Sequence, residues 1–239
     1  MKNKVKKINK IIFLILINLF VTSNLLSNEI NFEANSIELI DKDNKIIAKK
    51  NVKIFNQNET IYANEMDYDK SKQIIKAKGD IRIENLNKNI EILGDELTYF
   101  KEEEKIVLDK NVNINFEKSI FFNTNKIIYD KINNQIVFDS FSNFRDKFGN
   151  QVSFDKSKFL LGEKLLKIKS VKMIDELNNE YYFNNAIVNF KTNEIIADGI
   201  KIDFFKSSFG NKENDPRLRG NYFFSNNNQS LIKKGVFTT

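Results

Sequence analysis

The stretch Ile61-Tyr62-Ala63-Asn64-Glu65-Met66-Asp67-Tyr68 decides the fold, because its pattern returns about every 30 residues in both directions. The position of Ile61 is apolar in six copies: Phe32, Ile61, Ile92, Phe122, Val152 and Phe183. Seven residues later, the position of Tyr68 holds Leu39, Tyr68, Tyr99, Tyr129, Phe159 and Phe190. Both columns step by the same 29, 31, 30, 30 and 31 residues. This shared register predicts an array of β repeats.

The second half of each unit also repeats. After Tyr68 come a polar turn at 69–72, the apolar pair Ile74-Ile75, a tight turn at Lys78-Gly79 and the alternation Ile81-x-Ile83. The same turn position holds Lys50-Asn51, Lys110-Asn111 and Asp198-Gly199 in other copies, with Ser140 and Ser170 nearby in the looser fourth and fifth copies. Gly and Asn suit a backbone with φ above zero, and apolar residues two apart form half-buried strands. We therefore expect short strands that bury their apolar face only by stacking.

Residues 1–27 have the composition of a signal peptide. Five lysines precede an apolar run from Ile11 to Val21, and small residues at Ser23 and Ser27 could each precede a cleavage site. The run is short for a membrane span, although an uncleaved anchor is the alternative. Either interpretation predicts export.

The net charge of +6 comes mainly from this segment. Without its five lysines, 33 basic residues face 32 acidic ones, and the lysines are scattered among acids. The sequence therefore gives no electrostatic reason to expect a nucleic-acid partner.

The sequence contains no motif that is typical of a catalytic site. The chain contains no histidine and no cysteine, and it lacks a Gly-rich phosphate loop or a motif of metal-ligand type. We expect no catalytic residue, no metal site and no cofactor. A pair of carboxylates brought together by folding, as in a glycosidase, stays open as the weakest alternative.

The repeat array at residues 28–205 predicts an all-β domain with two kinds of face. The six-copy column that starts at Phe32 often has a second apolar residue two positions earlier, which puts both on one side of a sheet. Three residues after it stands a polar column, Asn35, Asn64, Asp95, Asn125 and Asp155, with Ala186 in the sixth copy. We favour a turn or bulge hydrogen bond for this polar column over a ligand contact.

The fold expected from these repeats is an open, V-shaped β-jelly roll of about six stacked strand pairs of about 30 residues each. If two rows of strands meet along one edge and splay along the other, the apolar column lines a trough. Such a trough suits acyl chains, because each buried CH₂ contributes about 0.8 kcal/mol. Ordinary core packing is the alternative for the same column.

The repeat unit resembles the OstA-like repeat of the lipopolysaccharide-transport proteins LptA, LptC and the periplasmic part of LptD. The similarity covers residues 30–205 and rests on the motif apolar-x-Ala-Asn/Asp-x-x-x-Tyr followed by a polar turn, an apolar pair and Lys-Gly or Lys-Asn. The resemblance implies a periplasmic conduit for lipopolysaccharide that is not an enzyme. Its acyl chains would lie against Phe32, Ile61, Ile92, Phe122, Val152 and Phe183.

The resemblance also implies protein partners at both ends of the stack. The amino-terminal edge, with Ile30, Phe32, Ile37 and Leu39, would accept a strand of an LptA-like bridge protein by β-augmentation. Residues 206–239 are similar to the junction between the periplasmic domain of LptD and its outer-membrane barrel. The junction residues would be Asn214, Pro216, Arg217 and Gly220, and the barrel would bring its lipoprotein plug as a further partner.

The sequence leaves alternatives open for the function. The nearest is a free bridge protein of the LptA kind with the same fold, and the alternative from another class is a structural β-solenoid that holds no ligand. The expected location is the periplasm at the outer membrane. A cysteine and a barrel usually follow an ending such as Lys234–Thr239 in LptD, and neither is present in this sequence.

Overall fold

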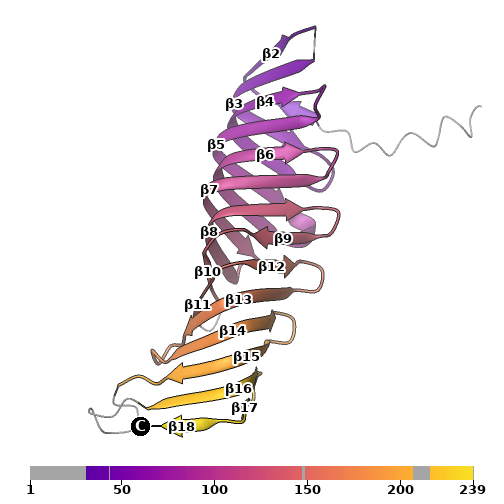
Figure 1. Cartoon of the computed structure of the whole chain (residues 1–239). Coiled ribbons are helices and arrows are strands. Elements are labelled where there is room, and N and C mark those ends of the chain that lie inside the picture. The colour runs from indigo at the N-terminus through magenta and orange to yellow at the C-terminus, as the bar shows by residue number, and fades with distance from the viewer. Residues whose placement is uncertain (1–30, 43, 147–148, 207–215, 239) are drawn as a thin grey trace, which may run out of the picture. The chain divides into compact units, whose positions relative to one another are not determined.

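The 30-residue period corresponds to pairs of long antiparallel strands in the computed structural model, which describes residues 31–42, 44–146, 149–206 and 216–238. In this part of the chain, 18 strands form one sheet (Figure 1). The expected all-β class is confirmed. The signal-peptide prediction for 1–27 lies outside the described residues.

The strands occupy most of the described chain. Their bounds are β1 (Asn31–Glu33), β2 (Ser36–Ile40), β3 (Lys45–Phe55), β4 (Thr60–Asp69), β5 (Ile74–Asn85), β6 (Ile90–Phe100), β7 (Lys105–Phe116), β8 (Ile120–Asp130), β9 (Gln135–Phe138), β10 (Ser142–Arg145), β11 (Gln151–Phe154), β12 (Ser157–Leu160), β13 (Leu165–Ile174), β14 (Glu180–Asn189), β15 (Glu194–Asp203), β16 (Arg217–Ser225), β17 (Ser230–Lys233) and β18 (Val236–Thr238). A single 3₁₀ turn, η2 (Leu86–Lys88), is described between β5 and β6.

Each pass of the sheet pairs with the pass before and after it along the chain. The long strands β3 to β8 and β13 to β16 are single passes, paired antiparallel with their sequence neighbours. Other passes are divided into two short strands: β9 and β10 both pair with β8, and β11 and β12 both pair with β13. The result is a meander in which contacts are local in sequence.

The tight turn predicted at Lys78-Gly79 is wrong, because β5 runs straight through it. β5 pairs with β6 on both sides of the position, and the register shifts between Lys78 and Ile81. Gly79 has φ +74° and Asp80 has φ +48°, so the prediction of positive φ was correct. A β-bulge bends a strand without reversing it. Equivalent positive-φ residues are Lys50, Asn51, Lys110, Asn111, Ser170 and Gly199.

The bulges divide each long strand into two halves that share one interior. In β5, Ile75 and Ala77 precede the bulge, Ile81 and Ile83 follow it, and all four are at most 2% exposed. The intervening side chains, such as Lys76 and Lys78, point to solvent. Buried and exposed side chains therefore alternate on both sides of the bend, and the two halves of each strand contribute to the same apolar interior.

The sheet extends beyond the boundary expected near residue 206. β16 pairs with β15 from Ile195↔Ser225 to Asp203↔Arg217, and β17 and β18 pair with β16. The segment expected as a junction therefore adds further strands to the same sheet.

Candidate functional site

The six-copy apolar column lies in the interior. Ile61, Ile92, Phe122, Val152 and Phe183 are each at most 5% exposed, and Phe32 is half-buried. Cross-strand pairs join Ile61, Ile83, Ile92, Ile114, Phe122, Phe144, Val152 and Met173 into one unbroken row. The interior therefore presents a continuous apolar strip over many strands.

The sixth copy is displaced from that row. Met173 pairs with Tyr181, whereas Phe183 pairs with Val171 in the neighbouring row. The row then continues from Tyr181 through Ile202 and Leu218 to Phe237. The sequence could not separate Tyr181 from Phe183, because both are aromatic and two residues apart lie on the same face.

A second row lines the opposite half of the interior. It joins Tyr68, Ile75, Tyr99, Ile106, Tyr129, Ile136, Phe159, Leu166, Val188 and Ile195. Phe122 from the first row and Phe159 from the second have ring centroids 5.6 Å apart, and Phe122 also contacts Phe138, Phe144 and Phe190. Aromatic side chains therefore fill the interior around β8 to β12.

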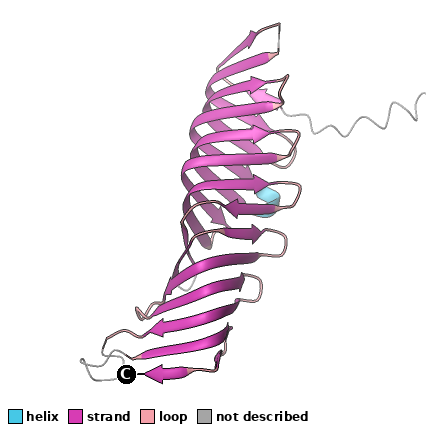
Figure 2. Ribbon diagram, in the orientation of Figure 1, coloured by secondary structure: helices cyan, strands magenta, loops and turns pink. Residues whose placement is uncertain are grey.

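Two parts of the sheet differ in how their turns are placed. In residues 45–138, here named the closed part, turns from the two ends of the strands meet at one mouth, where Lys131 bonds Glu59 and Lys88 bonds Tyr129 (Figure 2). In residues 165–238, the open part, the strands spread into a flatter sheet (Figure 1).

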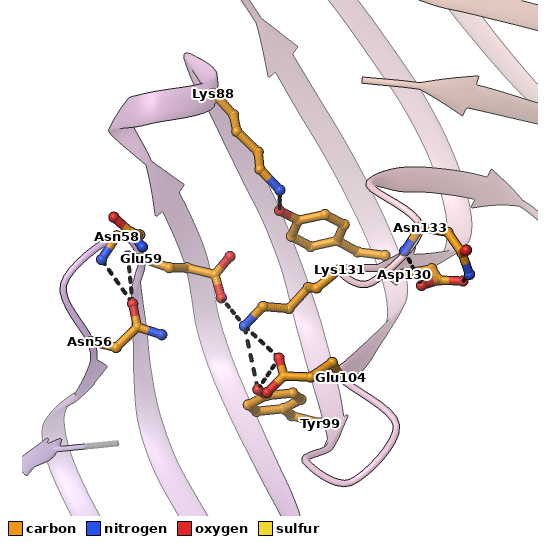
Figure 3. Close-up of polar contacts among 10 residues, drawn as sticks. Asn56, Asn58, Glu59, Lys88, Tyr99, Glu104, Asp130, Lys131 and Asn133 are labelled. Carbon is orange, nitrogen blue, oxygen red and sulfur yellow. Dashed lines mark hydrogen bonds and ion pairs between the residues drawn. The ribbon is translucent and has the colours of Figure 1, made fainter. Parts of the chain in front are cut away.

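An ion pair bridges the mouth of the closed part. Lys131 Nζ lies 2.9 Å from Glu59 Oε1 and 3.3 Å from Glu104 Oε2, and the Lys131 and Glu59 side chains are 17% and 4% exposed (Figure 3). Glu59 follows the turn after β3, whereas Lys131 begins the turn after β8, so the bond joins opposite ends of distant strands. We name Glu59, Tyr99, Glu104 and Lys131 the mouth cluster.

Burial is the largest single influence on Lys131 and would lower its pKa, but Glu59, Tyr99 and Glu104 together outweigh burial, so the pKa is raised. Tyr99 donates to Glu104 at 2.8 Å and accepts from Lys131 at 3.3 Å. Burial raises the pKa of Tyr99 to about 12. The cluster is therefore an ammonium and a neutral phenol at neutral pH.

Two more contacts cross the mouth. Lys88 Nζ in η2 donates to the Tyr129 hydroxyl at 3.0 Å, and burial lowers the pKa of Lys88. Lys164 lies 2.6 Å from Glu117, with both side chains about one-third exposed. The mouth is therefore bridged at three places, two within the closed part and a third, Glu117–Lys164, from the closed part to a turn just beyond it.

The lysines of the mouth form a column that the predictions from the sequence did not include. Backbone hydrogen bonds from one turn to the turn before it mark equivalent positions at Lys70, Lys101, Lys131, Leu161 and Phe190. Lys101 donates to Tyr68 at 3.1 Å, as Lys131 does to Tyr99. A lysine recurring two residues after the tyrosine column was the signal that could have revealed this.

A cavity of about 530 Å³ opens where the closed part meets the open part. Its lining includes Ile120, Val188, Phe190 and Ile195, surrounded by polar residues. A smaller space of about 20 Å³ lies next to it and reaches Val152 and Phe183. Two residues predicted for the interior site therefore adjoin this opening.

Three members of the polar column, Asn35, Asn64 and Asp95, form the bulge hydrogen bonds favoured from the sequence. Asn64 donates to Asp80 at 2.8 Å, and Asn111 donates to Asp95 at 2.6 Å. Asn51 donates to Asn35 at 3.3 Å. Each bond ties the column to the bulge 16 residues away, which supports a structural role.

The amino-terminal edge is exposed. Every residue of β2 is exposed, with Ile37 at 49% and Leu39 at 56%. Among the described strands, β3 alone pairs with β2. Phe32 packs against Tyr68 in a tilted arrangement with ring centroids 5.7 Å apart, and Ile30 lies outside the described residues.

The predicted junction residues belong to the added strands. Pro216 is buried and its carbonyl accepts from Phe204 N at 3.1 Å. Arg217 and Gly220 lie in β16, opposite Asp203 and Ile200. Asn214 lies outside the described residues.

Among the described residues, no three acidic, His or Cys side chains are grouped as metal ligands. The described helical residues contain no stretch with the length and apolar character needed to cross a membrane.

Residues 31–135 match the family described as "LptA/(LptD N-terminal domain) LPS transport protein". This match covers less than half of the chain. The description of the matched family is that of a transport protein. The matched residues contain most of the closed part, including Glu59, Tyr99 and Lys131.

Among solved structures, the chain is similar to the crystal structure of LptH, the LptA-homologous periplasmic component of the lipopolysaccharide transport device from Pseudomonas aeruginosa. The identity is 13%, the TM-score is 0.26, and the match covers 59% of this chain and 82% of LptH. A comparison with curated proteins finds no match.

Proposed function

We propose that this protein carries lipopolysaccharide by holding its acyl chains between the two interior rows, in the periplasm at the outer membrane. The observation that carries the proposal is the unbroken apolar row from Ile61 to Met173, which continues through Tyr181 into the open part. Burying hydrocarbon against such a strip is favourable at about 25 cal/mol per Å². The match of residues 31–135 to a lipopolysaccharide-transport family supports this ligand.

The packed aromatic rings set a condition on this function. Because Phe122 and Phe159 lie 5.6 Å apart, hydrocarbon can run past them only when the two halves of the sheet separate. The bulges supply a line along which each strand already bends. Loading therefore requires the sheet to widen about its bulges.

The exposed edge of β2 supports a protein partner. Its main-chain groups face away from β3, and Ile37 and Leu39 offer apolar contact. We propose that a bridge protein of the LptA kind adds a strand here by β-augmentation, with Ile30 and Phe32 beside it. Lipid would then pass from one interior to the next.

We propose that the far end, with Asn214, Pro216, Arg217 and Gly220, leads toward an outer-membrane barrel and its lipoprotein plug. The alternative is a free bridge protein, and the continuation of the sheet through β16, β17 and β18 favours it, because a second strand edge could also receive a partner. A barrel segment encoded downstream of Thr239 would support the proposal that this end leads to a barrel. An open reading frame that stops there would support the free bridge protein.

Photo-crosslinking tests the lipid-carrier function. A photoreactive residue at Ile92 or Phe122 should capture lipopolysaccharide, whereas one at exposed Lys76 or Lys158 should not. Lys158 is a matched control, since it neighbours the buried Phe159 on the same strand. Equal capture inside and outside would overturn the proposal.

A structural sheet without ligand is the second candidate, favoured by the aromatic filling around Phe122. Binding of an apolar fluorescent dye by the purified protein separates the two candidates. A carrier should bind the dye and release it when lipopolysaccharide is added. A purely structural sheet should bind neither.

A further inference from the structure

The mouth of the sheet is shut along the closed part and hollow beside the open part. Glu59–Lys131, Lys88–Tyr129 and Glu117–Lys164 span it in order along the chain. The next turn residues in that order, Asp146, Asn150, Phe190 and Asn193, line the cavity of about 530 Å³ instead. This change from a bridged mouth to a cavity occurs between repeat copies that have similar sequence patterns.

The side chain at one repeated turn position changes along the same order. This position is lysine in Lys70, Lys101 and Lys131, but Leu161 and then Phe190 follow at the equivalent places. Lys131 reaches across the mouth to a carboxylate, whereas Phe190 turns its ring inward onto Phe122, Phe144 and Phe159. The open part therefore presents hydrocarbon where the closed part presents an ion pair.

The cavity has the make-up of an amphiphile site. Ile120, Val188, Phe190 and Ile195 supply an apolar wall, and Ser119, Asn150, Asn189, Asn193 and Asn226 supply polar groups around it. Its volume falls within the roughly 300–1,000 Å³ of small-molecule pockets. An alkyl chain can lie against the wall while its polar end stays among the amides.

The cavity also connects with the proposed path of the acyl chains. Asp146, Val188 and Ile195 line both this cavity and the smaller space beside it, which touches Val152 and Phe183. At about 20 Å³, that space has room for little more than a water molecule. A chain in the cavity is thus one side-chain layer from the interior rows.

We propose that an acyl chain enters or leaves the interior sideways through this cavity, which we name the side port. The inference rests on the proposed lipid-carrier function. It adds that exchange with the surroundings happens between residues 117–120 and 188–195, and that the ion-paired mouth of the closed part keeps the chain inside once it has passed.

The test compares two positions of one cross-strand row. Ile195 lines the side port, and Ile106 lies in the same row under the closed mouth at 0% exposure. The full chain carries a photoreactive residue at one or the other, and capture of purified lipopolysaccharide is followed with time. We expect Ile195 to capture lipid at least about tenfold sooner than Ile106.

Each outcome of this experiment decides something. Capture at Ile106 as early as at Ile195 overturns the side port and leaves the carrier function standing. Capture at neither position overturns the carrier function and the side port together. Early capture at Ile195 followed by later capture at Ile106 supports both.

A pair of variants tests whether the side chain at position 190 controls access to the side port. Phe190→Lys, which copies the closed part, should slow capture at Ile195 at least about tenfold, and Phe190→Leu should keep it. Because Phe190→Lys removes ring contacts, its folding is checked by circular dichroism. If it does not fold, Asn193→Trp, which fills the mouth of the port, takes its place, and capture unchanged by it overturns the port.

Discussion

The closed and open parts of the sheet are built from the same repeat, yet side chains bridge the mouth of the closed part, whereas described turn residues of the open part line a cavity. In the closed part, charged side chains meet across the mouth, and Lys131 and Glu59 are almost buried. In the open part, the strands carry the same interior rows, but Leu218 and Ile195 are only half-buried. From this comparison we infer that the periodic rows determine the fold, whereas a few residues at the turns determine whether the mouth is bridged.

The largest expected effect tests how firmly the two parts are packed. Phe122→Asp places a carboxylate among four aromatic rings and should destabilise the protein by at least about 4 kcal/mol. Leu218→Asp, in the same row of the open part, should cost only about 1 to 2 kcal/mol because that site is half-buried. Urea denaturation measures both, and equal losses would remove the distinction between the parts.

The mouth cluster gives the next effect. Lys131→Met leaves Glu59 buried without its cation and should cost about 3 to 5 kcal/mol. The double variant Glu59→Gln/Lys131→Met should recover most of this loss, since it removes the uncompensated charge. A double-mutant cycle measures the coupling, and a coupling energy near zero would mean that the mouth is not held by this pair.

The pH dependence of the same pair follows from its raised pKa. Because the pKa of Lys131 is higher in the folded protein than in the unfolded chain, the stabilisation is fully present below about pH 10.5 and disappears as the pH rises through the folded-state value. The pKa of Tyr99 is also raised, to about 12, so the contribution of Tyr99 to stability also decreases as the pH rises. The difference in unfolding free energy between the natural protein and Lys131→Met should be constant from pH 7 to about 9 and fall above about 10.5. A difference that vanishes already near neutral pH would contradict the assignment.

The bulges should contribute to the stability of both the closed and the open part. Gly79 has φ +74° and Gly199 has φ +62°, and an added Cβ would lie 2.9 Å from Asn64 Nδ2 and 2.1 Å from Asn184 Nδ2 respectively. Replacing either by alanine should cost about 1 to 2 kcal/mol from the left-handed backbone alone. Thermal unfolding of the two variants measures this. A cost at Gly79 without one at Gly199 would restrict the bend to the closed part.

The smallest effect is expected at the outermost bridge. Lys164 and Glu117 are each about one-third exposed, so solvent screens their attraction. Lys164→Met should change stability by no more than about 1 kcal/mol. A loss as large as that of Lys131→Met would show that the mouth is held chiefly beside the side port.

Much of the fold follows from the sequence because the contacts are local and periodic. The Ile61 and Tyr68 columns predicted the interior faces, and Gly79 and Asn111 marked positive φ before the structure located the bulges. The turn prediction at Lys78-Gly79 failed because a bulge and a turn need the same backbone conformation. The bond between Glu59 and Lys131 spans 72 residues, and no local pattern links them. The displaced sixth copy was hidden because Tyr181 and Phe183 satisfy the same pattern.

The most direct test measures whether the closed part widens around lipid. The chain has no cysteine, so spin labels can be attached at Asn58→Cys and Ile132→Cys, which lie on facing turns of the mouth. A second pair, Asn58→Cys and Asn87→Cys, lies on neighbouring turns of one side and serves as the control. Electron paramagnetic resonance should show a longer distance between labels across the mouth when lipopolysaccharide binds, with the same-side distance unchanged. An unchanged distance across the mouth in a protein that has bound lipopolysaccharide would contradict transport through the interior rows.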